Sequence, residues 1–379
     1  MLRRHFALSC VGIAAIYIPT SLFPAPDVGI FLLPWLAHIR NAGPISAFAH
    51  PFSNYSPPYL YLLALASVLP ISGFAAIKLI AITGVCWLAL CMSQLAKVVG
   101  RDGFGLAERT LLLPTVILNG PILGQCDTIW TGCCILAVAD ALRQRPGRMA
   151  IWAGAAFAFK AQAAFLAPFF IGQVIRDRAW WTVAVPPLVY ILAIAPAALV
   201  GWQFTDLLTI YLRQPNFTFI GDAANLWAFP AALHVQGTSL FPIGYLLAFL
   251  GAAGIAFIGR RDLLLTALLC AIVVPFFLPK MLERFFFAAD LLSLANAYAR
   301  RDRMSIVLVV LVQAGSFLSV TAYLAEWPWL NAGASLLMAS ALGLTCVALL
   351  REQPNGFHDL GEVNSSPSKT LVVTNAVSS

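Results

Sequence analysis

Long apolar runs alternate with short polar segments along most of the chain. Many runs reach about 20 residues, the length that a helix needs to cross a hydrocarbon core of about 30 Å. The pattern predicts helices at about 5–23, 74–97, 106–123, 128–142, 149–160, 161–176, 180–201, 240–259, 263–279, 284–299, 304–323 and 332–350. The two helices that flank Lys160 are short for a full crossing, which fits a helix pair broken at that residue.

Residues 24–73 form the first outer loop in this scheme. The stretch 57–70 is apolar but only about a dozen residues long, below the roughly 17 needed to span. The stretch 30–40 places Trp35 and His38 among apolar side chains at helical spacing, as in an amphipathic helix that lies on a membrane. We therefore expect a structured outer loop with two interfacial helices.

Composition places the whole chain in the membrane class. Hydrophobic residues make up 60% of its 379 residues, and its mean hydropathy is +0.85. One soluble core cannot bury that much apolar surface. We expect an all-α polytopic bundle of about 10–12 transmembrane helices, with residues 1–352 as a single domain. Residues 353–379 are rich in Ser, Asn, Thr and Val without periodicity, which predicts a disordered cytoplasmic tail.

Basic residues set the expected orientation. The net charge of +7 comes from small basic groups between apolar runs, an arrangement typical of cytoplasmic loops and not of a nucleic-acid surface. Both termini then lie in the cytoplasm, and nucleic acid is not an expected partner. Arg3-Arg4 precede an apolar run without a clear cleavage site, so we interpret the run as a retained first helix. The eight cysteines show no CxxC spacing and predict neither a disulfide framework nor a zinc site.

Charged residues make up only 10% of the chain, and several recur in four short polar groups. An ionisable group near a bilayer costs several kcal/mol unless it is paired or faces a wet cavity. The four groups are Pro26-Asp27, Gln125-Cys126-Asp127, Lys160 and Lys280-Met281-Leu282-Glu283-Arg284. The charge pattern places them on the outer face, where we expect the functional site.

Two of these groups contribute a carboxylate at the start of a predicted helix. Asp27 and Asp127 can each accept a proton from a hydroxyl that reaches hydrogen-bond distance. Each can equally cap the helix that follows, a position that suits Asp. Gln125 beside Asp127 is suited to hydrogen-bonding hydroxyls or orienting a basic partner. Catalysis and capping remain open for both carboxylates.

The basic residues point to an anion. Lys160 lies in a run of Ala and Phe and should face a carboxylate or an anionic ligand, unless it extends to the outer headgroups. Lys280 and Arg284 lie on the side where the positive-inside rule disfavours them. Phosphate suits both side chains, and Glu283 can orient Arg284. The alternative is an ion pair that only fixes packing.

Aromatic residues supply a further candidate surface. Tyr55, Tyr59 and Tyr61 surround two prolines in the outer loop, where a tyrosine presents an apolar face and a polar tip. They fit a ledge for a sugar ring or a lipid chain, or an ordinary interfacial aromatic belt. Asn225 and Trp227 in the outer segment 202–230 are assigned to the same ledge.

The order of these segments resembles the GT-C superfamily of polytopic glycosyltransferases, in particular bacterial relatives of mannosyltransferases and of the lipid A aminoarabinose and protein O-mannosyl transferases. The likeness covers roughly residues 5–300. The matching segments are Asp27 early in the first outer loop, Tyr55-Ser56-Pro57-Pro58-Tyr59-Leu60-Tyr61 for Y-P-P-L-Y-L-Y, Gly124-Gln125-Cys126-Asp127 for G-Q-x-D, Lys160, Asn225-Leu226-Trp227 for N-L-W, and Pro279-Lys280-Met281-Leu282-Glu283-Arg284-Phe285 for P-K-M-H-E-R-Y.

The resemblance implies an inverting transfer of a mannose-like hexose from a polyprenyl-phosphate donor to a hydroxyl of a glycan, lipid or protein acceptor. It further implies a multi-pass protein of a bacterial inner membrane with its site facing the periplasm. Asp27 would be the base, Asp127 would position the acceptor or share that role, and Lys160, Arg284 and Lys280 would bind the donor phosphate.

Two departures from the family pattern limit what the resemblance implies. Leu282 stands in place of His and Phe285 in place of Tyr, so the resemblance does not imply a proton or metal role at those positions. The first loop contains no Asp-x-Asp or Glu-x-Asp motif, so no divalent metal cofactor is expected.

The competing hypothesis is a transporter or flippase of a lipid-linked sugar or small solute. Such a carrier uses broken helices and charges near the bilayer midplane. A lipid-binding scaffold without catalysis is a third possibility. The enzyme hypothesis requires Asp27, Asp127 and Lys160 to lie together in one cavity that opens to the outer face, whereas a carrier needs access from both sides.

Overall fold

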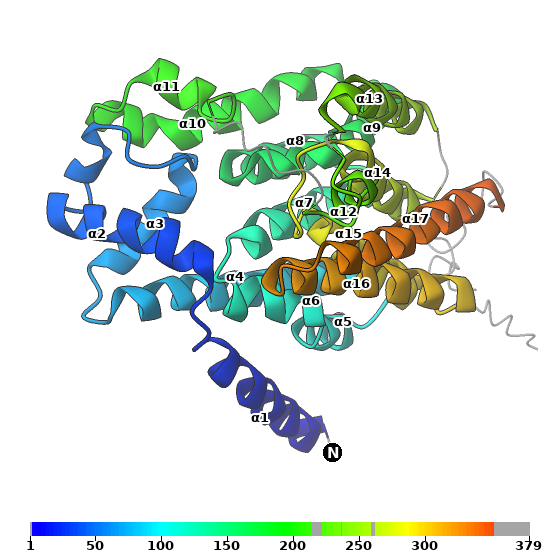
Figure 1. Cartoon of the computed structure of the whole chain (residues 1–379), viewed down its shortest axis with the longest axis horizontal. Coiled ribbons are helices and arrows are strands. Elements are labelled where there is room, and N and C mark those ends of the chain that lie inside the picture. Colours follow the sequence, from blue (N-terminus) through cyan, green and yellow to red (C-terminus); the bar gives the residue numbers. More distant parts are fainter. Residues whose placement is uncertain (1, 214–221, 236, 259–261, 352–379) are drawn as a thin grey trace, which may run out of the picture.

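The structure is a computed structural model that describes residues 2–213, 222–235, 237–258 and 262–351. Every regular element in these ranges is helical (Figure 1). The tail predicted at 353–379 lies outside the described residues. The all-α fold class is therefore confirmed for the described part of the chain.

Seventeen α-helices make up the described fold, joined in places by short π- or 3-10-helical turns. They are α1 (Leu2–Thr20), α2 (Leu33–Ala42), α3 (Pro57–Ser67), α4 (Gly73–Val98), α5 (Gly103–Leu111), α6 (Pro114–Ile117), α7 (Asp127–Leu142), α8 (Pro146–Phe159), α9 (Ala167–Asp177), α10 (Val185–Val200), α11 (Phe204–Thr209), α12 (Ala228–Ala232), α13 (Phe241–Phe257), α14 (Leu263–Phe277), α15 (Phe287–Arg300), α16 (Arg303–Leu324) and α17 (Pro328–Arg351). Each of the predicted helical segments is helical over most of its length.

One predicted helix, 106–123, is interrupted. Helix α5 ends at Leu111, and α6 begins at Pro114. Leu113 has extended backbone angles, φ −65° and ψ 128°, because the ring of the following proline disfavours the helical conformation. The break at Lys160 is confirmed. Helix α8 ends at Phe159, and Lys160 is extended, with φ −159° and ψ 136°.

The segment 24–73 folds as a unit with its own apolar core. A π-helical turn at Val28–Leu32 leads into α2, and α3 packs against α2. Leu36, Ile39, Leu60 and Leu63 are at most 1% exposed. Figure 1 shows α2 and α3 at one end of the molecule, beneath α10 and α11. The prediction of helices within this loop is confirmed.

Within the part of the chain that the structure describes, four helices are long and apolar enough to cross a membrane: α4, the continuous helix Trp180–Val200, α16 and α17. Shorter apolar helices occur at Val11–Thr20, α13 and α14. Large apolar side chains cover outward faces, among them Leu192 and Leu199 of α10 and Phe249 of α13, each at least 63% exposed. Extended apolar surface of this kind is unusual in soluble monomers and is consistent with an integral membrane protein.

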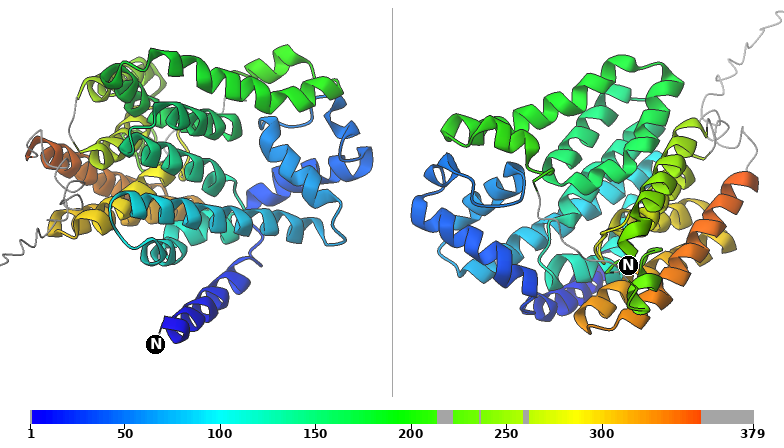
Figure 2. Two further views of the ribbon diagram at one scale, coloured as in Figure 1. Left: turned by 180° about the vertical axis from the view of Figure 1, so that it is seen from behind. Right: turned by 45° about the horizontal axis from the view of Figure 1, so that its top comes forward.

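Helices α7 and α14 occupy the interior of the bundle. Almost every residue of α14 is buried, and so are most residues of α7. Helix α4 packs along α7, whereas α1 extends away from the other helices in Figure 1 and in the left view of Figure 2. The close packing of α4 on α7 matters because the N-terminal end of α7 carries one of the candidate carboxylates.

Gly84 permits that close packing. A Cβ at Gly84 would lie 2.5 Å from Thr128 Oγ1 and 2.9 Å from Ile129 Cγ1. We predict that Gly84→Leu lowers the free energy of unfolding by roughly 1–3 kcal/mol, the usual cost of overpacking a core. Thermal unfolding of the purified protein measures the loss. The matched control is Gly254→Leu on α13, where a Cβ meets nothing within 4 Å. An equal loss in both variants would contradict the proposed role of Gly84.

Candidate functional site

Six side chains from four distant segments meet at the end of the bundle next to 24–73. They are Asp27, Gln125, Asp127, Lys160, Glu283 and Arg284, called here the charged cluster. Each lies at or beside a helix end or a break between helices. The sequence analysis named all six, and the structure brings them into one contiguous network.

Asp127 lies at the centre of the network and is 0% exposed. Its Oδ1 accepts hydrogen bonds from Lys160 Nζ and from Trp130 Nε1, each at 2.8 Å. Its Oδ2 lies 3.7 Å from Arg284 Nε. The carboxylate is thus bound by side chains, and the capping alternative does not describe its contacts. The sequence analysis did not predict Trp130. The signal that could have found it is its position one helical turn after Asp127.

Asp27 is the most accessible charged member of the cluster. Its Oδ2 accepts from Gln125 Nε2 at 2.8 Å and lies 3.0 Å from an Arg284 terminal nitrogen. It makes no side-chain capping bond to the π-helical turn that follows. Its side chain is 19% exposed, against 1–9% for the other charged members. Asp27 is therefore held on one oxygen and reachable from outside.

Arg284 is surrounded by carboxylates. It contacts Glu283 at 2.5 Å in addition to Asp27 and Asp127. Burial by itself would lower the pKa of Arg284, but the three carboxylates outweigh burial and raise it. Three carboxylates face two cations here, so the cluster carries a formal charge of −1 when all its members are ionised. A phosphate that approached Arg284 or Lys160 would compete with carboxylates already in contact.

Lys280 lies outside this network, although it shares a loop with Arg284. Its Nζ is 6.0 Å from the centre of the Phe241 ring. No carboxylate in the described ranges forms an ion pair with it. Of the three cations predicted to bind phosphate, Lys280 alone has no acidic partner among the residues that the structure describes.

The three predicted tyrosines have different surroundings. The Tyr55 hydroxyl donates to Gln125 Oε1 at 3.4 Å, and its ring centre is 5.7 Å from Lys160 Nζ. Burial raises the pKa of Tyr55, so its hydroxyl stays neutral. Tyr59 is 1% exposed and packs edge-on against Tyr55. The Tyr61 hydroxyl bonds to α10 through the Ala193 carbonyl. Only Tyr55 borders the charged cluster directly.

Asn225 and Trp227 contact the C-terminal end of α14. Asn225 Nδ2 donates to the carbonyls of Pro275 and Leu278 at 3.2 and 3.0 Å. Trp227 Nε1 donates to the carbonyl of Phe277 at 2.9 Å. The last carbonyls of a helix have no partner within it, so these side chains fix the exit of α14. That exit leads directly into the loop that carries Lys280 and Arg284.

Lys78 of α4 is a buried lysine that the sequence analysis missed. It is 4% exposed, and its Nζ donates to the carbonyls of Pro121 and Ile122 at 2.7 Å each. These are orphan carbonyls at the end of the π-helical turn Leu118–Ile122, which precedes Gln125. Lys78 therefore fixes the segment that leads to Gln125 and Asp127. A lone lysine in an apolar run is the same signal that singled out Lys160.

Asp222 is a second residue of interest that the sequence analysis did not single out. Burial, and then the charge of Glu283, raises the pKa of Asp222 from 3.8 to about 6. Its main-chain carbonyl accepts from Ser319 Oγ at 3.2 Å. Asp222 thus lies within electrostatic range of the charged cluster and titrates near neutral pH.

A metal centre is not evident in the described ranges, where no three His, Cys, Asp or Glu side chains are placed to hold an ion. No family model matches the chain, and no curated protein is significantly similar to it. A functional assignment must therefore rest on the geometry of the charged cluster and on the sequence motifs that supply it.

Breaking the Lys160–Asp127 pair should destabilise the fold. We predict that Lys160→Met lowers the free energy of unfolding by roughly 3–5 kcal/mol, because it leaves a buried carboxylate without its closest cation. The double variant Lys160→Met/Asp127→Asn should lose less than the sum of the two single losses, since the charges that remain are fewer. Thermal unfolding of all four proteins measures this coupling. Strictly additive losses would show that the two side chains act independently.

Asp222 predicts a pH dependence of stability. The folded state holds its proton up to about pH 6, whereas the unfolded chain releases it near the ordinary value of 3.8. Stability should therefore fall as the pH rises through that interval, because the folded state binds more protons than the unfolded state. Asp222→Asn should reduce the fall and raise the melting temperature at pH 7. Melting curves at pH 4.5–7.5 for both proteins test this, and parallel profiles would contradict it.

Proposed function

We propose that this protein is an integral membrane glycosyltransferase of the GT-C type, a bundle of about 10–12 spanning helices. In this proposal it transfers a mannose-like hexose from a polyprenyl-phosphate donor to an acceptor hydroxyl. One observation carries the proposal: the predicted carboxylates and two of the three predicted cations form one network, and Asp27 is its accessible member. The order of the sequence motifs gives separate support.

Asp27 is the base in this proposal. Gln125 and Arg284 hold its Oδ2, which leaves Oδ1 to accept the proton of an incoming hydroxyl. A general base must be within hydrogen-bond reach of that proton and have a fixed orientation. The resulting oxygen attacks the anomeric carbon, the bond from that carbon to the phosphate oxygen breaks, and the phosphate leaves with the electron pair. A single displacement inverts the configuration.

Asp127 acts indirectly in this scheme. It is buried between Lys160 and Arg284, where it has no direct access to an acceptor. Its negative charge holds both cations in place, and Arg284 then stabilises the charge that develops on the leaving phosphate. Lys160 supports that arrangement through Asp127. We propose no divalent metal in this reaction.

The proposed setting is a bacterial inner membrane, with the charged cluster facing the periplasm. The basic groups between apolar runs then lie in the cytoplasm, as the positive-inside rule requires. The cluster adjoins the segment 24–73 at one end of the bundle. A carrier would instead place its charges at mid-depth with access from both sides, so this position favours the transferase.

Sugar transfer by membranes that contain the full chain tests the proposal. We predict that Asp27→Asn lowers transfer from a panel of radiolabelled polyprenyl-phosphate sugars at least about 100-fold, the lower range for loss of a general base. Thermal unfolding should change little, because Asn retains the shape of the side chain and an acceptor oxygen. The control is Asp206→Asn, which alters an exposed ion pair with Arg213 and should leave transfer unchanged.

Each alternative outcome has a separate meaning. Equal transfer by the wild type and Asp27→Asn would remove Asp27 from the mechanism. No transfer from any donor in the panel, combined with movement of a lipid-linked sugar across vesicle membranes, would replace the transferase with the flippase hypothesis.

A further inference from the structure

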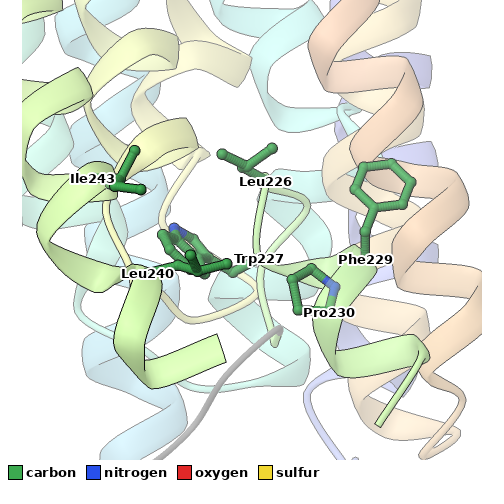
Figure 3. A pocket seen from close by; sticks show the side chains of 7 residues that line it. Leu226, Trp227, Phe229, Pro230, Leu240 and Ile243 are labelled. Atoms are coloured by element: carbon green, nitrogen blue, oxygen red, sulfur yellow. The ribbon is translucent and has the colours of Figure 1, made fainter. Parts of the chain in front are cut away.

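Two regions of the described structure differ sharply in polarity. One is an apolar pocket of about 250 Å³ between the segment 226–230 and the start of α13. Figure 3 shows its apolar walls, with Leu240 and Phe229 on opposite sides, and no charged side chain lines it. The other region lies where α6, α15 and α16 meet, and side-chain oxygen atoms gather there around Asp290. Of the two, only the second offers ligands for an ion.

Asp290 is a buried carboxylate without a cationic partner. It is 1% exposed, and no ion pair among the described residues includes it. Its Oδ1 has no hydrogen-bond partner within the described ranges. Asp290 lies in the first turn of α15, where the helix dipole favours the ionised form of a carboxyl group. Because an unpaired carboxylate in an apolar interior is costly, its charge needs a counter-ion.

The neighbouring groups present oxygen atoms to Asp290. The hydroxyls of Thr115 on α6 and Ser316 on α16 face its carboxyl group, and both residues are at most 4% exposed. Thr115 has one hydroxyl proton, which it donates to Gln313 Oε1 at 3.0 Å. Gln313 Nε2 donates in turn to the main-chain carbonyl of Asp290 at 3.3 Å. Side-chain oxygens of four residues on three helices therefore lie close together.

We infer that these oxygens bind one monovalent alkali cation, Na⁺ or K⁺. Carboxylate, hydroxyl and amide oxygens are ligands of hard cations. One carboxylate balances one positive charge, whereas a divalent ion would leave an excess charge in apolar surroundings. A proton would bridge only a single pair of these oxygens. Such a site needs no group of three His, Cys, Asp or Glu side chains, in agreement with the absence of such a group from the described ranges.

The ion would hold two segments that lead to the charged cluster. Asn119, one helical turn after Thr115, donates its side-chain amide to the Thr115 carbonyl at 3.0 Å. The Asn119 carbonyl accepts from the main-chain N–H of Gln125 at 3.0 Å. Asp290 lies in the first turn of the helix that follows the loop with Arg284. A bound cation therefore stabilises the backbone on both sides without contacting the charged cluster.

Equilibrium binding of radioactive sodium, or of radioactive rubidium in place of K⁺, tests the inference on the full chain in lipid nanodiscs. The wild type should bind a single ion, and its melting temperature should rise with the alkali cation while N-methylglucamine keeps the ionic strength constant. Asp290→Asn should weaken binding at least about tenfold, because it removes the charged ligand. Ser316→Ala, which removes a neutral ligand, should weaken binding about threefold.

Asp140→Asn is the matched control. Asp140 is also 1% exposed, but it forms ion pairs with Arg143 and Arg148, so its loss should leave binding of the ion unchanged. Equal binding by the wild type and Asp290→Asn would overturn the inference, and so would equal stabilisation by N-methylglucamine. A melting temperature that varies with pH but not with the cation would assign a proton to Asp290 instead.

Two further comparisons complete the test. Tighter binding of Mg²⁺ or Ca²⁺ than of either alkali cation would overturn the monovalent assignment. Unchanged binding of the ion in Asp27→Asn would support a site separate from the charged cluster, whereas its loss would overturn that separation. None of these measurements requires sugar transfer, so the ion site and the proposed function stand or fall independently.

Discussion

The buried ion chain from Lys160 through Asp127 to Arg284 constrains the rest of the structure. Each of these charges would be costly in an apolar interior if it were alone. Their contacts require four segments, spread from Asp27 to Arg284 in the sequence, to reach the same place. The ends of α7, α8 and α14 must then converge, and so must the start of the segment 24–73. This requirement accounts for the helix breaks at these positions, where a continuous apolar helix could otherwise cross a membrane.

The breaks create unpaired main-chain groups, and side chains outside the charged cluster satisfy them. Lys78 donates to the carbonyls at the end of the turn before Gln125, while Asn225 and Trp227 donate to those at the end of α14. Unsatisfied carbonyls in an apolar setting cost several kcal/mol. The same bonds fix the two loops that carry Asp127 and Arg284. These bonds therefore hold the irregular backbone where the proposed chemistry needs a fixed orientation.

The sequence predicts the helices well, because their apolar periodicity and length depend on local composition. It also predicts the members of the charged cluster, since a charged side chain in an apolar run needs a partner or a wet cavity. It does not predict which charges pair. Lys160 was expected to face a carboxylate or an anionic ligand, and Arg284 to bind phosphate or to form an ion pair. In the structure both contact carboxylates. Asn225 was assigned to a ledge, yet its amide bonds to α14. Such contacts depend on how distant helix ends meet, which composition and spacing leave open.

In the proposed reaction, the charge balance of the site would give different cations different roles. A cluster with three carboxylates and two cations carries a net negative charge. It therefore attracts a hydroxyl that is losing its proton less strongly than a neutral site would, unless the arriving donor changes that balance. A phosphate near Arg284 would add further negative charge, so it must be held partly by another cation. Lys280 lies on the same loop as Arg284 and has no acidic partner among the described residues. Arg284 can then orient Asp27 before transfer and respond to the leaving phosphate during it, since its guanidinium offers five donors. Binding and catalysis would depend on different cations of the same short loop.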